Sequence, residues 1–275
     1  MQRLEKLVAD FKGQSKHPSQ EEMENFIREH LQVRALQLLF QSKFGGAFSF
    51  MGGTCLRICY DLKRYSEDLD FALDGDKRGY HFTELIDFVQ KELQLVGFSL
   101  NTNVHEEKTV QKAFLRFQNL YSHFGLKSVK PNQKIHIKIE VDTHPIPLKK
   151  EERESFFVAR SGEIFPILKH TLPTLFAGKI IAILFRPYAR GRDYYDLIWY
   201  LSRKTPLNFR YLKAGAQGAK LENGLEVVHA LKKKMSEVKP EIILRDMGRF
   251  LEDPIESSWI SQYSKIFDQL SQNLI

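Results

Sequence analysis

The chain has 275 residues, of which 43% are hydrophobic and 27% are charged, and its formal net charge is +7. This composition excludes an intrinsically disordered chain, and the length is sufficient for a substantial core in one or two domains. No apolar run is long enough to span a bilayer, and the first residues lack an uninterrupted apolar segment, so we expect neither a membrane span nor a signal peptide.

The predicted elements begin with helices over residues 1–12 and 20–42, the second preceded by a capping box of Ser19 and Glu22. A region of mixed strands and helices follows. Strands are predicted near 47–51, 68–73, 98–106, 111–118 and 134–143, a helix over 82–96, a loop over 120–133, and short strands at 156–160 and 163–167. From residue 172 the pattern is helical to the end, with breaks near Pro206, Gly218, Pro240 and Pro254. The order of elements indicates an α+β fold with a mixed sheet core, flanking helices and a helical C-terminal part.

A glycine pair ends the first predicted strand. Gly52 and Gly53 can turn sharply and allow a ligand to approach the main chain. The segment from Thr54 to Tyr60 is predicted to continue as a helix, whose first N–H groups attract anions, and Arg57 lies one turn further on. The same pair would also fit an ordinary strand-to-helix turn. Cys55 and Cys59 lie in this helix, and with no other cysteine in the chain we expect them to be packing residues in a reducing cytoplasm.

Two carboxylates follow in the next predicted strand. Asp68 and Asp70 are two residues apart, so they project to one face while Leu69 and Phe71 face the core. Two adjacent like charges are unfavourable unless a cation or a proton lies between them. A hard divalent cation held by these carboxylates and by substrate phosphates would meet that requirement, and the glycine turn just upstream favours it over a solvated strand edge.

The stretch 108–150 holds nine Lys or Arg but two acids, Glu140 and Asp142, so it accounts for the whole formal net charge. Aromatic residues interleave with the basic ones at Phe114, Phe117, Tyr121 and Phe124. This pattern predicts a positive surface for a nucleic acid, although a solvated basic face or a docking surface for an acidic protein would have the same composition.

Residues 135–143 alternate strictly between apolar and polar side chains. Ile135, Ile137, Ile139 and Val141 are predicted on one face, and His136, Lys138, Glu140 and Asp142 on the other. The polar face either is merely solvated or supplies a further acid to the site of Asp68 and Asp70.

The helix predicted over Leu172–Phe185 has Pro173 in its first turn and is stopped by Pro187. Lys179 and Arg186 are seven residues apart and share a helix face, as do Asp193 and Asp196 on the next predicted helix. Such spacing also produces salt bridges between helices, and a structural and a functional role are compatible.

The pattern Gly52-Gly53-Thr54, Arg57, Tyr60, Arg64, Ser66, Asp68 and Asp70 resembles motif one of the AbiEii/AbiGii toxin family, and the likeness covers roughly residues 35–200. It implies a nucleotidyltransferase fold similar to polymerase beta, with a core over residues 1–170 and a helical domain over residues 171–275 that completes the active site. The wider superfamily typically has Gly-Ser at the turn. Here Thr54 or Ser66 would replace that serine.

The resemblance also implies roles for residues. Asp68, Asp70 and Glu140 would bind Mg²⁺ or Mn²⁺, with Asp142 as the alternative third acid, which completes the metal site or accepts a proton. Lys179 would hold the triphosphate of an NTP substrate, and Asp193 or Asp196 would position Lys179 or support catalysis. The predicted nucleotide-binding residues are Gly52, Gly53, Thr54, Arg57, Ser66, Lys179 and Arg186.

By the same resemblance the chain is expected to be a cytoplasmic toxin of abortive-infection and phage-defence systems. It would transfer a nucleotide to RNA, with the tRNA 3′ end as the expected acceptor, and a cognate antitoxin would neutralise it. Two alternatives stay open: transfer to a small molecule or a protein, and a non-catalytic module that binds RNA or an antitoxin.

Overall fold

The computed structural model describes residues 1–14, 18–128 and 133–275, which divide into two compact units. Unit 1 comprises Met1–Asp61, Tyr65–Pro145 and Ser155–Lys169, and unit 2 comprises Leu62–Arg64, Ile146–Glu154 and His170–Ile275. The main change of unit therefore falls beside the predicted boundary at residue 170. Two short segments that the sequence division places in the first domain, 62–64 and 146–154, belong to unit 2.

Unit 1 is built on a mixed sheet that has seven strands over the described residues, in the order β3-β4-β5-β2-β1-β7-β6. The strands are β1 (Ser49–Met51), β2 (Asp68–Ala72), β3 (Leu100–His105), β4 (Val110–Phe117), β5 (His136–Asp142), β6 (Arg153–Arg160) and β7 (Glu163–His170). Strand β2 runs antiparallel to β1 and parallel to β5, while β4 is antiparallel to both β3 and β5. All the predicted strands are confirmed, and the last two are longer than expected.

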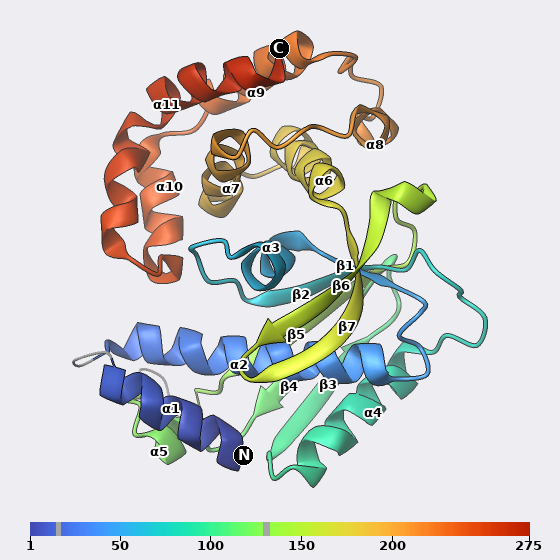
Figure 1. Cartoon of the computed structure of the whole chain (residues 1–275), viewed down its shortest axis with the longest axis vertical. Helices are drawn as coiled ribbons and strands as arrows, with labels where there is room; N and C mark the ends of the chain where they lie inside the picture. Colours follow the sequence, from blue (N-terminus) through green and yellow to red (C-terminus); the bar gives the residue numbers. More distant parts are fainter. Residues whose placement is uncertain (15–17, 129–132) are drawn as a thin grey trace. The chain divides into compact units, whose positions relative to one another are not determined.

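The helices of unit 1 are α1 (Gln2–Gln14), α2 (Gln20–Gln41), α3 (Gly52–Tyr60), α4 (Phe82–Leu95) and α5 (Leu120–Phe124). Both hydrogen bonds of the predicted capping box at Ser19 and Glu22 are present. Helix α4 lies along β3, and α2 contacts both α4 and β5 (Figure 1). The apolar sides of β4 and β5 are buried in this layer, which leaves their polar sides on the opposite face of the sheet.

The predicted loop over residues 120–133 is wrong at its start, where α5 forms. Asn119 and Gly125, which flank this short helix, both adopt left-handed backbone conformations that end regular structure within a few residues. The helix forms because Leu120, Tyr121 and Phe124 are buried on it, a tertiary effect that local sequence does not reveal. Pro131 and Asn132 of the predicted loop lie outside the described residues.

Unit 2 is helical, as predicted. Its α-helices are α6 (Leu172–Phe185), α7 (Gly191–Ser202), α8 (Phe209–Gly215), α9 (Gly224–Ser236), α10 (Pro240–Met247) and α11 (Tyr263–Leu270), and its 3₁₀ segments are η1 (Lys150–Glu152), η2 (Gly248–Phe250), η3 (Pro254–Gln262) and η4 (Ser271–Leu274). Within this unit, α9, α10 and α11 form an outer arc beside α6 and α7 (Figure 1). Pro206 and Gly218 lie between helices, whereas Pro240 and Pro254 begin elements, because proline suits a first helical turn.

Both cysteines lie in α3, where Cys55 is buried and Cys59 half-buried, in agreement with packing roles.

Within the part of the chain that the structure describes, no helix combines the length and the apolar character needed to cross a bilayer.

Candidate active site

The glycine turn brings the start of α3 against β2. Gly52 has φ of 77°, in the left-handed region, and Met51 before it lies opposite Asp70 in the sheet. A Cβ atom built on Gly52 would overlap the carboxylate of Asp70. Gly52 is therefore required both for the backbone turn and for the close approach of Asp70.

Asp68 and Asp70 project to one face of β2, as the alternation predicted. Both are half-buried, whereas Leu69 and Phe71 are buried in the core. The side chain of Asp68 is 26% exposed, so a ligand can reach it.

Glu140 lies directly opposite Asp70 in the parallel pair of β2 and β5. Its carboxylate binds two lysines, with Oε1 2.9 Å from Lys112 Nζ and Oε2 2.8 Å from Lys138 Nζ. Lys138 also lies 3.8 Å from Asp68. Although burial would raise the pKa of Glu140, hydrogen bonds from Lys138 and Lys112 outweigh it and lower that pKa. Glu140 is thus held as a carboxylate.

Asp142, the alternative third acid, lies one step further along the same face. It pairs with Ala72 rather than with an aspartate, and its Oδ1 accepts a hydrogen bond from the backbone N–H of His144 at 3.0 Å. The register therefore favours Glu140 as the partner of Asp70.

The oxygen donors of Asp68 and Asp70 have the chemistry that a hard divalent cation requires, and Gly52 leaves space beside Asp70 that a Cβ would fill. Lys138 already places a positive charge beside Asp68 and Glu140. Across the described residues, no three His, Cys, Asp or Glu side chains gather as a preformed metal site. Two aspartates together with substrate phosphates fit Mg²⁺, while Glu140 would first have to leave its lysines.

Three of the predicted nucleotide-binding residues, Thr54, Arg57 and Ser66, are buried or half-buried in unit 1. Thr54 is fully buried and its hydroxyl donates to the backbone carbonyl of Asp68, so the hydroxyl already has a partner within the protein, and its contact with a nucleotide stays a prediction. Arg57 is also buried, with its guanidinium 2.6 Å from Glu29 and over the ring of Tyr65, which favours a structural role. Ser66 is half-buried. Its contact with nucleotide, like that of Gly53, stays a prediction.

In unit 2 the predicted lysine and aspartates form one ion cluster. Lys179 Nζ lies 2.7 Å from Asp193 and 2.8 Å from Asp196, and Arg186 also binds Asp193. This confirms that each pair shares a helix face. Burial opposes the charge on Lys179, but Asp193 and Asp196 outweigh it and raise its pKa. Burial likewise opposes ionisation of Asp193, but Lys179 and Arg186 hold its pKa low.

Arg64 completes this cluster, although the resemblance assigned no role to this residue. It is 2% exposed, and both Nε and Nη2 lie 2.6 Å from the carboxylate of Asp196. In the sequence, only its place in the motif pointed to Arg64, because its partner Asp196 lies 132 residues away and their contact has no local pattern. The lysines on Glu140 were likewise missed: Lys112 and Lys138 were counted as part of a basic tract and not as partners of an acid.

Three of the four aromatic residues that interleave with the basic ones in the sequence do not lie on a positive surface. Phe117, Tyr121 and Phe124 are buried in unit 1, so their rings cannot stack on a nucleic acid. Phe114 is the exception among the four, and it is half-buried on the polar face of β4. Lys130 of the basic tract lies outside the described residues.

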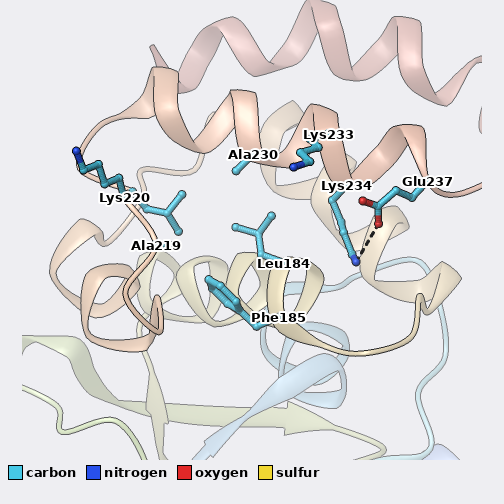
Figure 2. Close-up of a pocket in the computed structure, with 9 residues that line it drawn as sticks. Leu184, Phe185, Ala219, Lys220, Ala230, Lys233, Lys234 and Glu237 are labelled. Carbon is cyan, nitrogen blue, oxygen red and sulfur yellow. Dashed lines mark ion pairs between the residues drawn. The ribbon is translucent and has the colours of Figure 1, made fainter.

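A separate hollow of about 290 Å³ lies within unit 2, between the end of α6 and α9 (Figure 2). Leu184 and Phe185 form an apolar side, and Lys220, Lys233 and Lys234 line it with charge. Lys234 is paired with Glu237 at 3.1 Å, as Figure 2 shows. Lys233 and Lys234 on α9 therefore line a depression.

Comparisons with known proteins agree with this architecture. Residues 34–274 match the family described as nucleotidyl transferase AbiEii toxin of type IV toxin–antitoxin systems. The crystal structure of JHP933 from Helicobacter pylori is similar in fold, with a TM-score of 0.53 and 15% identity over 90% of this chain and 94% of that one. Another H. pylori crystal structure, of a proposed nucleotidyltransferase, has a TM-score of 0.52 and 16% identity over 88% of this chain and 95% of that one. No curated protein is a significant match.

Proposed function

Because the chain belongs to the AbiEii family of nucleotidyl transferase toxins of type IV toxin–antitoxin systems, we propose that it transfers a nucleotide from an NTP to an RNA acceptor, with the tRNA 3′ end as the expected site. A toxin of such a system implies a cognate antitoxin. We propose that the transfer depends on Mg²⁺ or Mn²⁺ and serves abortive infection and phage defence in the cytoplasm.

The observation that carries the proposal is the sheet register. It sets Asp70 opposite Glu140, with Asp68 on the same face and the Gly52 turn against the Asp70 carboxylate. These carboxylates share a face although they come from strands about 70 residues apart in sequence. Lys112 and Lys138 offset part of this negative charge, and a divalent cation between Asp68 and Asp70 would offset more of it.

In the proposed reaction, an acceptor hydroxyl oxygen forms a bond to the α-phosphorus of the NTP, and the bond from that phosphorus to the bridging oxygen breaks to release pyrophosphate. Backbone N–H groups at the start of α3 would hold phosphate oxygens. Glu140 would take the proton of the attacking hydroxyl. A divalent ion held by Asp68 and Asp70 would supply charge neutralisation at the phosphates. The chain's own contribution is thus positioning and electrostatics.

The two lysines that bind Glu140 affect its strength as the base that accepts the proton of the hydroxyl. Because Lys112 and Lys138 lower the pKa of Glu140, its carboxylate is ionised and ready at neutral pH, but it is a weak base while both pairs persist. Release of one lysine toward a phosphate would raise the proton affinity of Glu140.

The experiment is incubation of the purified chain with Mg²⁺, each α-labelled NTP in turn and total cellular RNA, beside the isosteric variant Asp70→Asn. We expect label in a tRNA-sized band with the unchanged chain and none with Asp70→Asn, because the variant loses one of the paired charges that hold the cation. Its melting temperature should stay close to that of the parent.

The matched control is Asp76→Asn, which removes an exposed carboxylate that binds Arg78 in the loop after β2. Full activity of Asp70→Asn would show that Asp70 is not part of the active site. Label in a small molecule or a protein would assign one of the alternative acceptors, and no label in any fraction would favour the non-catalytic module.

The role of Lys179 in holding the triphosphate stays a prediction. Within unit 2 its ammonium is bound by Asp193 and Asp196, which supports the proposed role of one or both acids in positioning Lys179. Arg186 is bound to Asp193 in the same cluster, and its contact with nucleotide is likewise a prediction.

A further inference from the structure

The face of the sheet that carries the candidate carboxylates continues across three more strands. Asp70 lies opposite Glu140, Glu140 opposite Lys112, and Lys112 opposite His105. Residues directly opposite one another project to the same side of a sheet, so these four side chains form one row from β2 to β3.

A second row runs beside the first, from Asp68 through Lys138 and Phe114 to Asn103. A third row joins His136, Arg116 and Asn101. We call the outer part of these rows, on β3, β4 and β5, the sheet platform: Asn101, Asn103, His105, Lys112, Phe114, Arg116, His136 and Lys138.

The sheet platform is open to ligands. His105, Arg116 and His136 are exposed, and Lys112, Phe114 and Lys138 are half-buried. The alternate residues of the same strands, such as Leu115, Ile137 and Ile139, are fully buried against the helical layer. The platform is therefore the ligand-accessible side of a rigid sheet whose other side is core.

Phe114 is the aromatic residue in the middle of this face. The guanidinium of Arg116 lies 5.8 Å from the centre of its ring, and the His136 ring lies 6.2 Å from it. An accessible aromatic ring among cations on a sheet is the arrangement on which unpaired bases stack. A duplex would not use it, because paired bases do not offer their faces.

A hollow of about 300 Å³ adjoins the end of the first row. It is lined by His105, Glu107, Lys108, Val110 and Lys112, so two lysines face one acid. Lys112 belongs both to this hollow and to the pair with Glu140. Lys112 and Lys108 thus lie one after the other from the candidate carboxylates to the β3-β4 turn, where a backbone phosphate could be bound.

We propose that the sheet platform binds the single-stranded end of the RNA acceptor, with one base stacked on Phe114 and the adjoining phosphates bound by Arg116, Lys112 and the hollow at the β3-β4 turn. This inference rests on the proposed transfer to RNA. Phe114 is two strand spacings, about 10 Å, from Asp68 across the sheet. A base on Phe114 would therefore belong to a nucleotide close to the reacting hydroxyl, and the platform would select an unpaired end over a duplex.

The test measures binding and transfer separately. A fluorescently labelled short single-stranded RNA, alone and annealed to its complement, is titrated with the full chain in the absence of NTP and divalent ions. The variants are Phe114→Ala and Phe114→Trp, and the matched control is Phe157→Ala, which removes another phenylalanine of unit 1 that is 67% exposed on β6.

We expect the parent chain to bind the single strand more tightly than the duplex. Phe114→Ala should weaken single-strand binding about tenfold, since the variant loses one base stacked on an aromatic ring. Phe114→Trp and Phe157→Ala should bind as the parent does. In the transfer reaction, Phe114→Ala should raise KM for RNA by a similar factor and leave kcat and KM for the NTP unchanged.

If Phe114→Ala and Phe157→Ala bind the single strand equally tightly, the sheet platform is not the surface that binds it, even if both variants label RNA. Tighter binding of the duplex than of the single strand overturns it as well. If the parent labels no RNA, the proposed transferase function fails, but the binding titration still decides whether this face holds single strands. Arg116→Gln, which removes an exposed side chain, repeats the test if Phe114→Ala fails to fold.

Discussion

At the scale of single residues, Gly52 links the backbone turn to the chemistry of Asp70. Its φ of 77° lies in the region that costs other residues about 1–2 kcal/mol, and any Cβ would also overlap the Asp70 carboxylate. We expect Gly52→Ala to lower the melting temperature and to abolish nucleotide transfer, because the carboxylate must move. Thermal unfolding and label transfer measure the two effects.

Gly46→Ala is the control for that substitution. Gly46 has a negative φ and a Cβ there would meet no atom within 4 Å, so the variant should keep both stability and activity. A Gly52→Ala protein with parental activity would show that the close approach of Gly52 and Asp70 is incidental.

At the scale of elements, strand faces were predictable from the sequence and strand neighbours were not. The alternation at Asp68–Phe71 and along residues 135–141 gave the correct buried faces, since side chains in a strand point to opposite sides in turn. The pairing of Glu140 with Lys112 depends on the register between β4 and β5, which no local pattern encodes. The burial of Phe117 and the formation of α5 were missed for the same reason.

A glycine inside helix α6 is a site where a substitution should stabilise the protein. Gly178 lies in its interior with a helical φ, and a Cβ there would make only ordinary contact, 3.9 Å from Tyr211. Glycine inside a helix costs roughly 0.5–1 kcal/mol relative to alanine. Gly178→Ala should therefore increase the free energy of unfolding by about that amount, as measured by urea denaturation.

The contrasting variant is Gly191→Ala at the start of α7. A Cβ at Gly191 would fall 2.7 Å from the backbone oxygen of Ile243, so this change should destabilise unit 2. If Gly178→Ala is destabilising too, the packing of α6 against α8 is tighter than the structure indicates.

At the scale of the whole molecule, ion pairs between distant parts of the chain hold each unit together. In unit 2, Arg64 and Asp196 are joined across 132 residues, and in unit 1 Arg160 binds Glu29 across 131. Such partners cannot be predicted from one sequence, because each charge alone fits a solvated surface. The family motif marked Arg64 and Asp196 as notable, but their buried contact comes from the fold.

The buried His30 of α2 makes stability depend on pH. The residue is 5% exposed, and burial together with the nearby Arg3, N-terminus and Arg34 lowers its pKa from 6.5 to about 4. His30 Nδ1 makes no hydrogen bond to any described residue. The folded state therefore excludes a proton that the unfolded chain binds below pH 6.5, so stability should fall as the pH drops from 6.5 toward 4.

The expected loss in the free energy of unfolding between pH 7 and pH 5 is about 2 kcal/mol from this residue. The carboxylates with lowered pKa, such as Asp193, lose their contribution only at more acid pH, as they are protonated in the folded state. Urea unfolding at a series of pH values measures the slope. His30→Gln should flatten it between pH 7 and pH 5, whereas His81→Gln, an exposed histidine of unit 1 whose side chain makes no cap hydrogen bond, should leave it as in the parent. If the free energy of unfolding of His30→Gln falls with pH as steeply as that of the parent, a group other than His30 binds the proton on unfolding. The folded state would then tolerate a charged His30 beside Arg3 and Arg34.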